Sequence, residues 1–338
     1  MYKDLTLHDI AKKLCEKADT WIIFHRKPDP DCVGSAVALA GVLEKLGNKV
    51  CLVGSDRIPE RLAFINAPEP YRVLSAEDVK TEKLPGRIIS VDVASKAQTG
   101  GIFEILESRG ARVDLMIDHH EKGGRFADGY VDPDAAATGE ILFDLFEMMG
   151  SVGPAKEGKW PLQSAKAVYA AIAGDTGGFR FSNTTGRTHE RIAELMTYPL
   201  GHDEICRKIF ASKTRGQLRA EAEALSHFEF LMGGQATYYY MSLAVKHKLN
   251  LLDEDLGTMI DVIREIENVR VAIIVREEDG GKYRVSMRST DTVNVADICA
   301  TFSGGGHARA GGFTVGAESP EKLKADILAL VRAQMGET

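Results

Sequence analysis

The stretch TWIIFHRKPDPDCVGSAVALAGVLEKLG, residues 20–47, holds the first strand-like run of the chain and the helical pattern that follows it. The apolar run at its start is typical of a buried strand, and the later apolar spacing with Gly47 predicts a helix and its end. A turn between the two needs only proline, aspartate and glycine. The segment between them also contains His25, Asp29 and Asp31, which are more than such a turn requires. A set of imidazole and carboxylate groups suits a divalent metal.

Short apolar runs continue to alternate with amphipathic segments beyond this stretch. Strands that alternate with helices indicate βαβ units, so the first part of the chain is predicted to be an α/β domain with a parallel, doubly wound sheet. We place this domain at residues 1–190. Further strands are expected within 49–54, 86–95 and 111–120, and further helices within 99–110, 138–150 and 164–175.

The rest of the chain changes character twice. Residues 191–233 are charged, helical in pattern and poor in strand signals, which predicts a helical linker. Residues 234–338 are expected to form a smaller α/β domain with a mixed sheet, in which a hairpin turns at 279–281. Ser319 and Pro320 are typical of the start of a final amphipathic helix.

Composition narrows the function. The chain has 338 residues, 44% hydrophobic and 27% charged, as in soluble globular proteins with about two domains. Its net charge of −7 argues against long duplex nucleic acid as a partner, because that needs a broad basic surface. No run predicts a signal peptide or a membrane span. Five scattered cysteines indicate reduced thiols, so a cytoplasmic location is expected, and nothing indicates an oligomeric state.

Acids and histidines follow several of the predicted strands. Taken singly, Asp92 could be a capping residue, Asp175 a turn residue, and His119 with His120 a surface pair. Together they are informative, because ligands gather at the carboxyl edge of an open parallel sheet. The candidate residues at this edge are His25, Asp29, Asp31, Asp92, Asp118, His119, His120 and Asp175.

So many ligands exceed what one cation needs. They suit two divalent cations about 3.5–4 Å apart that share a carboxylate and act on a phosphoester. Oxygen ligands with imidazoles and no thiolate favour Mn²⁺, with Mg²⁺ or Co²⁺ as alternatives.

Four motifs resemble those of the DHH phosphoesterase superfamily: HRKPDPDCVGS at 25–35, SVD at 90–92, IDHH at 117–120 and GDTGGFRFSNTT at 174–185. The resemblance implies that His25, Asp29 and Asp92 bind one Mn²⁺. It implies that Asp31, Asp92, His119 and Asp175 bind the other, with Asp92 bridging. It further implies that His120 faces the scissile phosphate and that Asp118 orients the histidines.

The segment FSGGGHARAGGF, 302–313, is unusually rich in glycine. Its backbone N–H groups are suited to an anion, and a tight turn would need fewer glycines. It resembles the G-G-G-H motif of the C-terminal domain found in one branch of DHH enzymes. One departure is that GGGH is followed by ARAGGF here, where many relatives carry a double alanine before the glycine. The expected substrate-binding residues are Arg288, Gly304, Gly305, Gly306, His307 and Arg309.

This C-terminal motif separates branches of the superfamily. Family II pyrophosphatases lack it, RecJ-type exonucleases carry further domains, and membrane-anchored cyclic-dinucleotide enzymes need spans. What remains resembles the bifunctional enzymes that degrade very short single-stranded RNA and remove the 3′-phosphate of 3′-phosphoadenosine 5′-phosphate (pAp). We expect a ligand to be bound by the metal ions at one end and by the glycine-rich segment at the other. Phosphodiesterases for cyclic or linear dinucleotides (c-di-AMP, pApA, pGpG) remain an alternative, and a non-catalytic nucleotide-binding protein is a further one.

Overall fold

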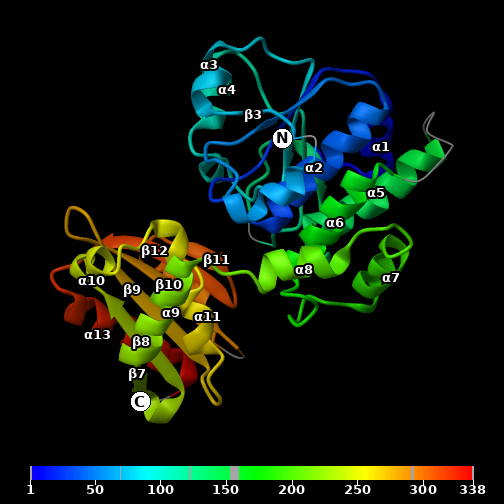
Figure 1. Cartoon of the computed structure of the whole chain (residues 1–338). Helices are drawn as coiled ribbons and strands as arrows, with labels where there is room; N and C mark the ends of the chain where they lie inside the picture. The colour runs from blue at the N-terminus through cyan, green and yellow to red at the C-terminus, as the bar shows by residue number, and fades with distance from the viewer. Residues whose placement is uncertain (1, 69, 122, 153–159, 291–292, 337–338) are drawn as a thin grey trace. The chain divides into compact units, whose positions relative to one another are not determined.

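The chain folds into two compact units, Met1–Ser212 and Lys213–Thr338 (Figure 1). The computed structural model describes residues 2–68, 70–121, 123–152, 160–290 and 293–336, without the side chains of Ser151, Val152 and His307. The segment 191–233, expected as a linker, is divided between the two units.

Unit 1 is built on a six-stranded sheet in the order β3-β2-β1-β4-β5-β6, and all of its strand pairs are parallel. The order runs outward in both directions from β1 and β4, which is the doubly wound arrangement that the sequence predicts. The strands are β1 (Thr20–Ile23), β2 (Val50–Val53), β3 (Val73–Leu74), β4 (Arg87–Val91), β5 (Leu115–Asp118) and β6 (Asp128–Val131).

Helices cover both faces of this sheet because its strands are apolar on both sides. Along β1, Ile22 packs into the core formed with α1, α2, α5 and α6, whereas Trp21 and Ile23 pack into the core formed with α3 and α4. The helical elements of unit 1 are α1 (Leu7–Cys15), α2 (Pro30–Lys45), η1 (Glu60–Asn66), α3 (Ala76–Thr81), η2 (Lys96–Thr99), α4 (Ile102–Ser108), α5 (Thr138–Val152), α6 (Leu162–Asp175), α7 (Gly186–Leu195) and α8 (His202–Phe210).

Small residues bring α2 and α6 into close contact. A Cβ at Gly34 would lie 2.5 Å from the backbone oxygen of Ala167 and 2.9 Å from the Cβ of Ala171. A Cβ at Gly139, in the first turn of α5, would lie 2.5 Å from that same Ala171 Cβ. Three helices that begin or end at the carboxyl edge of the sheet are therefore locked together there.

Unit 2 contains a mixed six-stranded sheet in the order β11-β12-β10-β9-β8-β7, in which β8 and β9 are parallel and the other pairs antiparallel. The predicted hairpin is confirmed, since β9 and β10 pair on either side of 279–281. The elements are α9 (Arg215–His227), β7 (Glu229–Leu231), η3 (Met232–Gly234), β8 (Ala236–Met241), α10 (Leu243–Lys248), η4 (Asp253–Leu256), α11 (Met259–Arg264), β9 (Val271–Glu278), β10 (Lys282–Ser289), α12 (Val295–Ala300), β11 (Gly305–His307), β12 (Ala310–Gly316) and α13 (Pro320–Met335).

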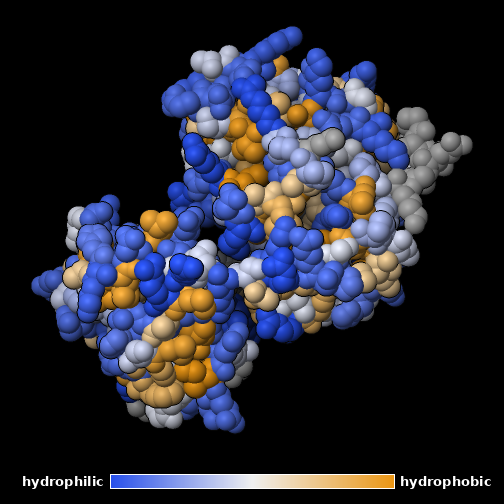
Figure 2. All heavy atoms as spheres, viewed as in Figure 1, coloured by the Kyte–Doolittle hydropathy of each residue, from blue (hydrophilic) through white to orange (hydrophobic). Residues whose placement is uncertain are grey.

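On the face shown in Figure 2, most of the surface is hydrophilic, and apolar atoms gather over part of unit 2 near α9 and over part of unit 1. Leu218 and Leu225 on α9 are 54% and 47% exposed. Among the described residues, no helix is both long enough and apolar enough to cross a bilayer.

Candidate metal centre

The candidate ligands come from the ends of three strands and from two helices. His25 follows β1, Asp92 follows β4, and His119 follows β5, whose last residue is Asp118. Asp92 has a left-handed backbone with φ +55°. The local sequence thus delivers these side chains to the carboxyl edge of the sheet, where ligands of such folds bind.

The helix α2 starts earlier than the apolar pattern predicts. Pro30 occupies its first position, and the Asp29 carboxylate accepts a hydrogen bond of 3.0 Å from the Cys32 N–H as the N-cap. Asp31 therefore lies in the first helical turn instead of in a loop. Similarly, Asp175 is the last residue of α6, where the sequence indicated a glycine-rich turn.

One donor group forms around His25. Its Nε2 lies 3.4 Å from Asp29 Oδ2 and 3.5 Å from Asp92 Oδ2. The Nδ1–H can donate to the backbone carbonyl of Arg26, 2.8 Å away, and this tautomer leaves the Nε2 lone pair toward the two carboxylates. These three side chains are the ones that the family resemblance assigns to the first cation.

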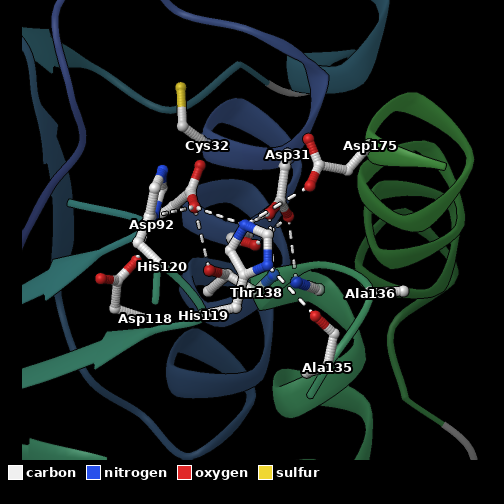
Figure 3. A network of polar contacts seen from close by, with 12 residues as sticks. Asp31, Cys32, Asp92, Asp118, His119, His120, Ala135, Ala136, Thr138 and Asp175 are labelled. Atoms are coloured by element: carbon white, nitrogen blue, oxygen red, sulfur yellow. Dashed lines mark hydrogen bonds and ion pairs between the residues drawn. The ribbon is translucent and has the colours of Figure 1, made fainter. Parts of the chain in front are cut away.

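A second donor group forms around His119, whose ring lies among three carboxylates (Figure 3). Its Nε2 is 3.4 Å from Asp175 Oδ2, 3.7 Å from Asp92 Oδ1 and 3.8 Å from Asp31 Oδ2. The Nδ1 lies 3.2 Å from the carbonyl oxygen of Ala135, which fixes the ring. Since Asp92 faces His25 with one oxygen and His119 with the other, it is placed to bridge two cations.

His120 makes a different set of contacts from its neighbour. Its Nδ1 is 2.7 Å from Asp118 Oδ1, a short charge-assisted hydrogen bond, and 3.7 Å from Asp92 Oδ1. The carboxylate of Asp118 therefore holds the ring by one nitrogen. That contact fixes the orientation of the ring, as the Nδ1 contacts do for the other two histidines, and Asp92, His119 and His120 together offer donor atoms within 4.8 Å of one another.

The site concentrates negative charge in a buried place. The side chains of Asp31 and Asp92 are 1% and 2% exposed. Burial raises the pKa of Asp31 well above its usual value, and the charges of Asp92 and Asp175 add to the increase. Burial also raises the pKa of Asp175 to about 7. Bound divalent cations favour the ionised form of such carboxylates, and the two donor groups that share Asp92 fit two of them.

Two model matches cover most of the chain. Residues 19–172 match the DHH family, N-terminal domain, and residues 234–337 match the DHHA1 domain. The chain therefore contains a DHH-family domain followed by a DHHA1 domain. The resemblance carried by the four motifs is thereby confirmed at the level of the family.

Three known proteins show how this DHH-family chain relates to others. The bifunctional oligoribonuclease and PAP phosphatase NrnA of Thermus thermophilus is 28% identical over 318 residues, which cover 93% of this chain and 90% of that protein. The cyclic-di-AMP phosphodiesterase PdeA of Listeria monocytogenes is 23% identical over 313 residues, 88% of this chain and 45% of that protein. An exopolyphosphatase-related protein from Bacteroides fragilis has the same fold, with a TM-score of 0.85 and 22% identity over 97% of this chain and 96% of its own.

The DHHA1 part places Arg288 beside the glycine-rich segment. In the sheet of unit 2, Met287 pairs with Gly311 of β12, which pairs on its other side with Gly306 of β11. Arg288 is half-buried near the end of β10. Arg309 donates to the backbone carbonyl of Val293 at 3.0 Å, and so contributes to the local fold. The His307 side chain lies outside the described residues.

Packing explains much of the glycine content that the sequence linked to anion binding. A Cβ at Gly304 would lie 2.4 Å from the Cβ of Phe313, and one at Gly306 would lie 2.2 Å from a backbone oxygen. At Gly305, in contrast, an added Cβ would meet nothing within 4 Å. The close approach of β11 to β12 thus requires two of the three glycines, and Gly305 is the one with open space beside it.

Two residues near the candidate metal ligands were missed by the sequence reasoning. Thr138 donates its hydroxyl to Asp92 Oδ1 at 3.0 Å and its backbone N–H to Asp31 Oδ2 at 2.7 Å. Cys32 brings its Sγ within 4.8 Å of donor atoms of His25, Asp29 and Asp92. Thr138 opens α5, so a threonine at a helix start could have been noted, but only the fold shows which acids it meets.

Proposed function

We propose that this chain is a divalent-cation-dependent phosphoesterase that hydrolyses short oligoribonucleotides to mononucleotides and removes the 3′-phosphate of pAp. The observation that carries the proposal is the sharing of Asp92 between the two donor groups. Full-length similarity to an oligoribonuclease and PAP phosphatase supports this choice of substrate.

The proposed cations are two Mn²⁺, with Mg²⁺ or Co²⁺ as alternatives. One would be held by His25, Asp29 and Asp92. The other would be held by a set that shares Asp92 with the first, namely Asp31, Asp92, His119 and Asp175. Bound there, the pair would polarise the phosphoryl oxygen and supply an activated water.

The protein's own groups have separate proposed roles around that chemistry. His120 donates a hydrogen bond to a phosphoryl oxygen, where negative charge increases during displacement. Asp118 keeps that ring in place through the 2.7 Å contact. Thr138 fixes the bridging carboxylate through its hydroxyl. In the second unit, Arg288, Gly304–Gly306, His307 and Arg309 are proposed to bind a substrate phosphate, with Gly305 the position that leaves room for one.

The alternative is a phosphodiesterase for cyclic or linear dinucleotides. Similarity to the Listeria enzyme favours it, since that protein is a cyclic-di-AMP phosphodiesterase. The same donor groups would serve either substrate, so the two proposals differ in specificity and not in mechanism.

Turnover of pAp, a diribonucleotide and c-di-AMP, measured side by side with Mn²⁺, tests the proposal. We expect faster hydrolysis of the diribonucleotide and pAp than of c-di-AMP. Asp31→Asn protein purified in the same way is the control for contaminating phosphatases and should be inactive. A higher kcat/KM for c-di-AMP would replace the proposal with the alternative.

A further inference from the structure

Unit 2 contains a buried arginine that the proposed function does not use. Arg276, on β9, is 7% exposed, and its Nε has no hydrogen-bond partner among the described residues. Arg284 lies directly opposite on β10, so two like charges occupy one cross-strand pair. An unpaired buried guanidinium and like charges placed opposite one another both cost stability. The arrangement therefore needs a compensating group.

The nearby charged residues only partly compensate the pair. Asp253 and Glu278 attract Arg276, and Arg284 repels it; burial together with Arg284 lowers the pKa of Arg276 to about 10. Asp253 is already in an ion pair with Lys246. In the part of the chain that the structure describes, neither carboxylate forms an ion pair with Arg276 or Arg284. Three positively charged side chains, Lys246, Arg276 and Arg284, thus share two carboxylates. One of these, Asp253, is already paired with Lys246.

The strand that carries Arg284 also carries Arg288 on the same face. Along β10, side chains alternate between buried and half-buried, and Arg284, Ser286 and Arg288 are the half-buried ones. Arg288 follows Arg284 by four residues, so at about 3.4 Å per residue the Cα atoms of the two arginines lie about 14 Å apart along the strand. Such a distance exceeds the span of the two phosphates on one nucleoside and requires further nucleotides.

We propose that Arg276 and Arg284 form a second phosphate-binding site, which holds a phosphodiester of a linear oligoribonucleotide whose other phosphate lies at Arg288. This inference rests on the proposed function and adds a preference for substrate length. An oligonucleotide of several residues would contact both sites, whereas pAp would reach only one of them.

Fluorescence anisotropy of a labelled pentaribonucleotide, with full-length protein in EDTA to prevent cleavage, measures this contribution. Loss of a charge-assisted hydrogen bond should raise the Kd about tenfold or more in Arg276→Gln and in Arg284→Gln. The Kd of pAp, measured by competition in the same assay, should change less than twofold. Arg219→Gln is the matched control, because Arg219 is an exposed arginine on α9 and its loss removes the same charge. Arg284 is half-buried, so its variant remains informative if Arg276→Gln fails to fold.

Inorganic phosphate provides a second measurement that does not depend on the proposed function. Phosphate should raise the midpoint of thermal unfolding of the wild type more than that of Arg284→Gln, because a ligand of the folded state stabilises it. Equal shifts in both proteins, or equal loss of pAp and pentaribonucleotide binding, would overturn the second site. A lost phosphate shift with unchanged pentaribonucleotide binding would show a site for free phosphate and would overturn the oligonucleotide assignment. If the wild type neither binds nor hydrolyses either nucleotide, the proposed function fails, and the phosphate shift alone decides the anion site.

Discussion

Two adjacent histidines of the centre differ in what holds their Nδ1 atoms. His119 is fixed by a backbone carbonyl and turns Nε2 to three carboxylates, whereas His120 is fixed by Asp118. His119→Ala should therefore lower the occupancy of one cation and be partly rescued by excess Mn²⁺. His120→Ala should keep both cations but slow turnover about 10²–10³-fold, since it removes a donor to developing charge.

Metal titration by calorimetry beside kinetics on each variant checks this division. The conservative variant His120→Gln retains an N–H donor and should recover part of the activity. If His120→Ala proved to be the variant that loses a cation, the two assignments would be exchanged.

The acidity of the second donor group gives a pH prediction. Burial raises the pKa of Asp175 to about 7, so without metal this carboxyl holds its proton below neutral pH. Protons then compete with Mn²⁺, and affinity should fall as pH is lowered from 8 to 6, by about tenfold per pH unit for each proton displaced. Isothermal titration in buffers of different ionisation enthalpy would count the protons released. An affinity independent of pH would contradict the raised pKa.

At the scale of single residues, the sequence identified the acids and histidines whose side chains lie close together. It did not identify the residues that hydrogen-bond to them or lie beside them. A histidine or aspartate after an apolar run can be recognised because its chemistry is in the residue itself. Thr138 could not, because its role depends on Asp31 and Asp92, which lie far away in the chain. The buried Cys32 was likewise missed, because only the fold shows that its Sγ lies near the donor atoms of His25, Asp29 and Asp92.

At the scale of elements, the contact between α2 and α6 should be sensitive to one methyl group. Gly34→Ala places a Cβ 2.5 Å from the Ala167 oxygen, so one helix must shift. We expect a loss of about 1–3 kcal/mol in the free energy of unfolding, as for overpacked cores. Because α6 ends at Asp175, weaker Mn²⁺ binding should accompany the loss.

Urea unfolding in EDTA and metal titration measure the two effects separately. Gly150→Ala provides the control: Gly150 lies in α5, and a Cβ there meets nothing within 4 Å. That change should be neutral or stabilise by up to about 1 kcal/mol through helix propensity. Equal stability of the two variants would contradict the tight contact.

Elements with a clear hydrophobic period were predicted from the sequence. Strands that are defined only by pairing with a neighbouring strand were not. The helix α13 begins after Ser319 with Pro320 at its first position, as predicted. The two-residue β3 and the edge strand β6 gave no recognisable signal, because pairing with a neighbour defines them. The strand β11, made from glycines, exists only against β12.

At the scale of the whole molecule, separate cores predict separate unfolding. The described part of unit 1 has its own hydrophobic clusters, and so does that of unit 2. Mn²⁺ binds folded unit 1 only in this assignment, so it should raise the midpoint of one calorimetric transition and leave the other in place. Asp92→Ala should abolish that shift. A single transition that moves as a whole would show that the units unfold together.

The division of labour between the units can be tested by comparing two substrates. If unit 2 holds a substrate phosphate, Arg288→Gln should raise KM for pAp and short RNA about tenfold or more, as expected for a lost charge-assisted hydrogen bond. Hydrolysis of bis-p-nitrophenyl phosphate, which needs only the metal centre, should change little. Equal loss on both substrates would place Arg288 in the catalytic step or in folding.

The left-handed backbone at Asp92 determines which substitution best inactivates the protein while keeping it folded. Most residues pay about 1–2 kcal/mol for that conformation, but asparagine tolerates it nearly as well as aspartate. Asp92→Asn therefore removes the shared charge without the strain that alanine adds at φ +55°. Such an inactive but correctly folded variant, immobilised on a resin, would bind substrates without hydrolysing them. The nucleotides that it retains from a cell extract, identified by mass spectrometry, would reveal its physiological substrates.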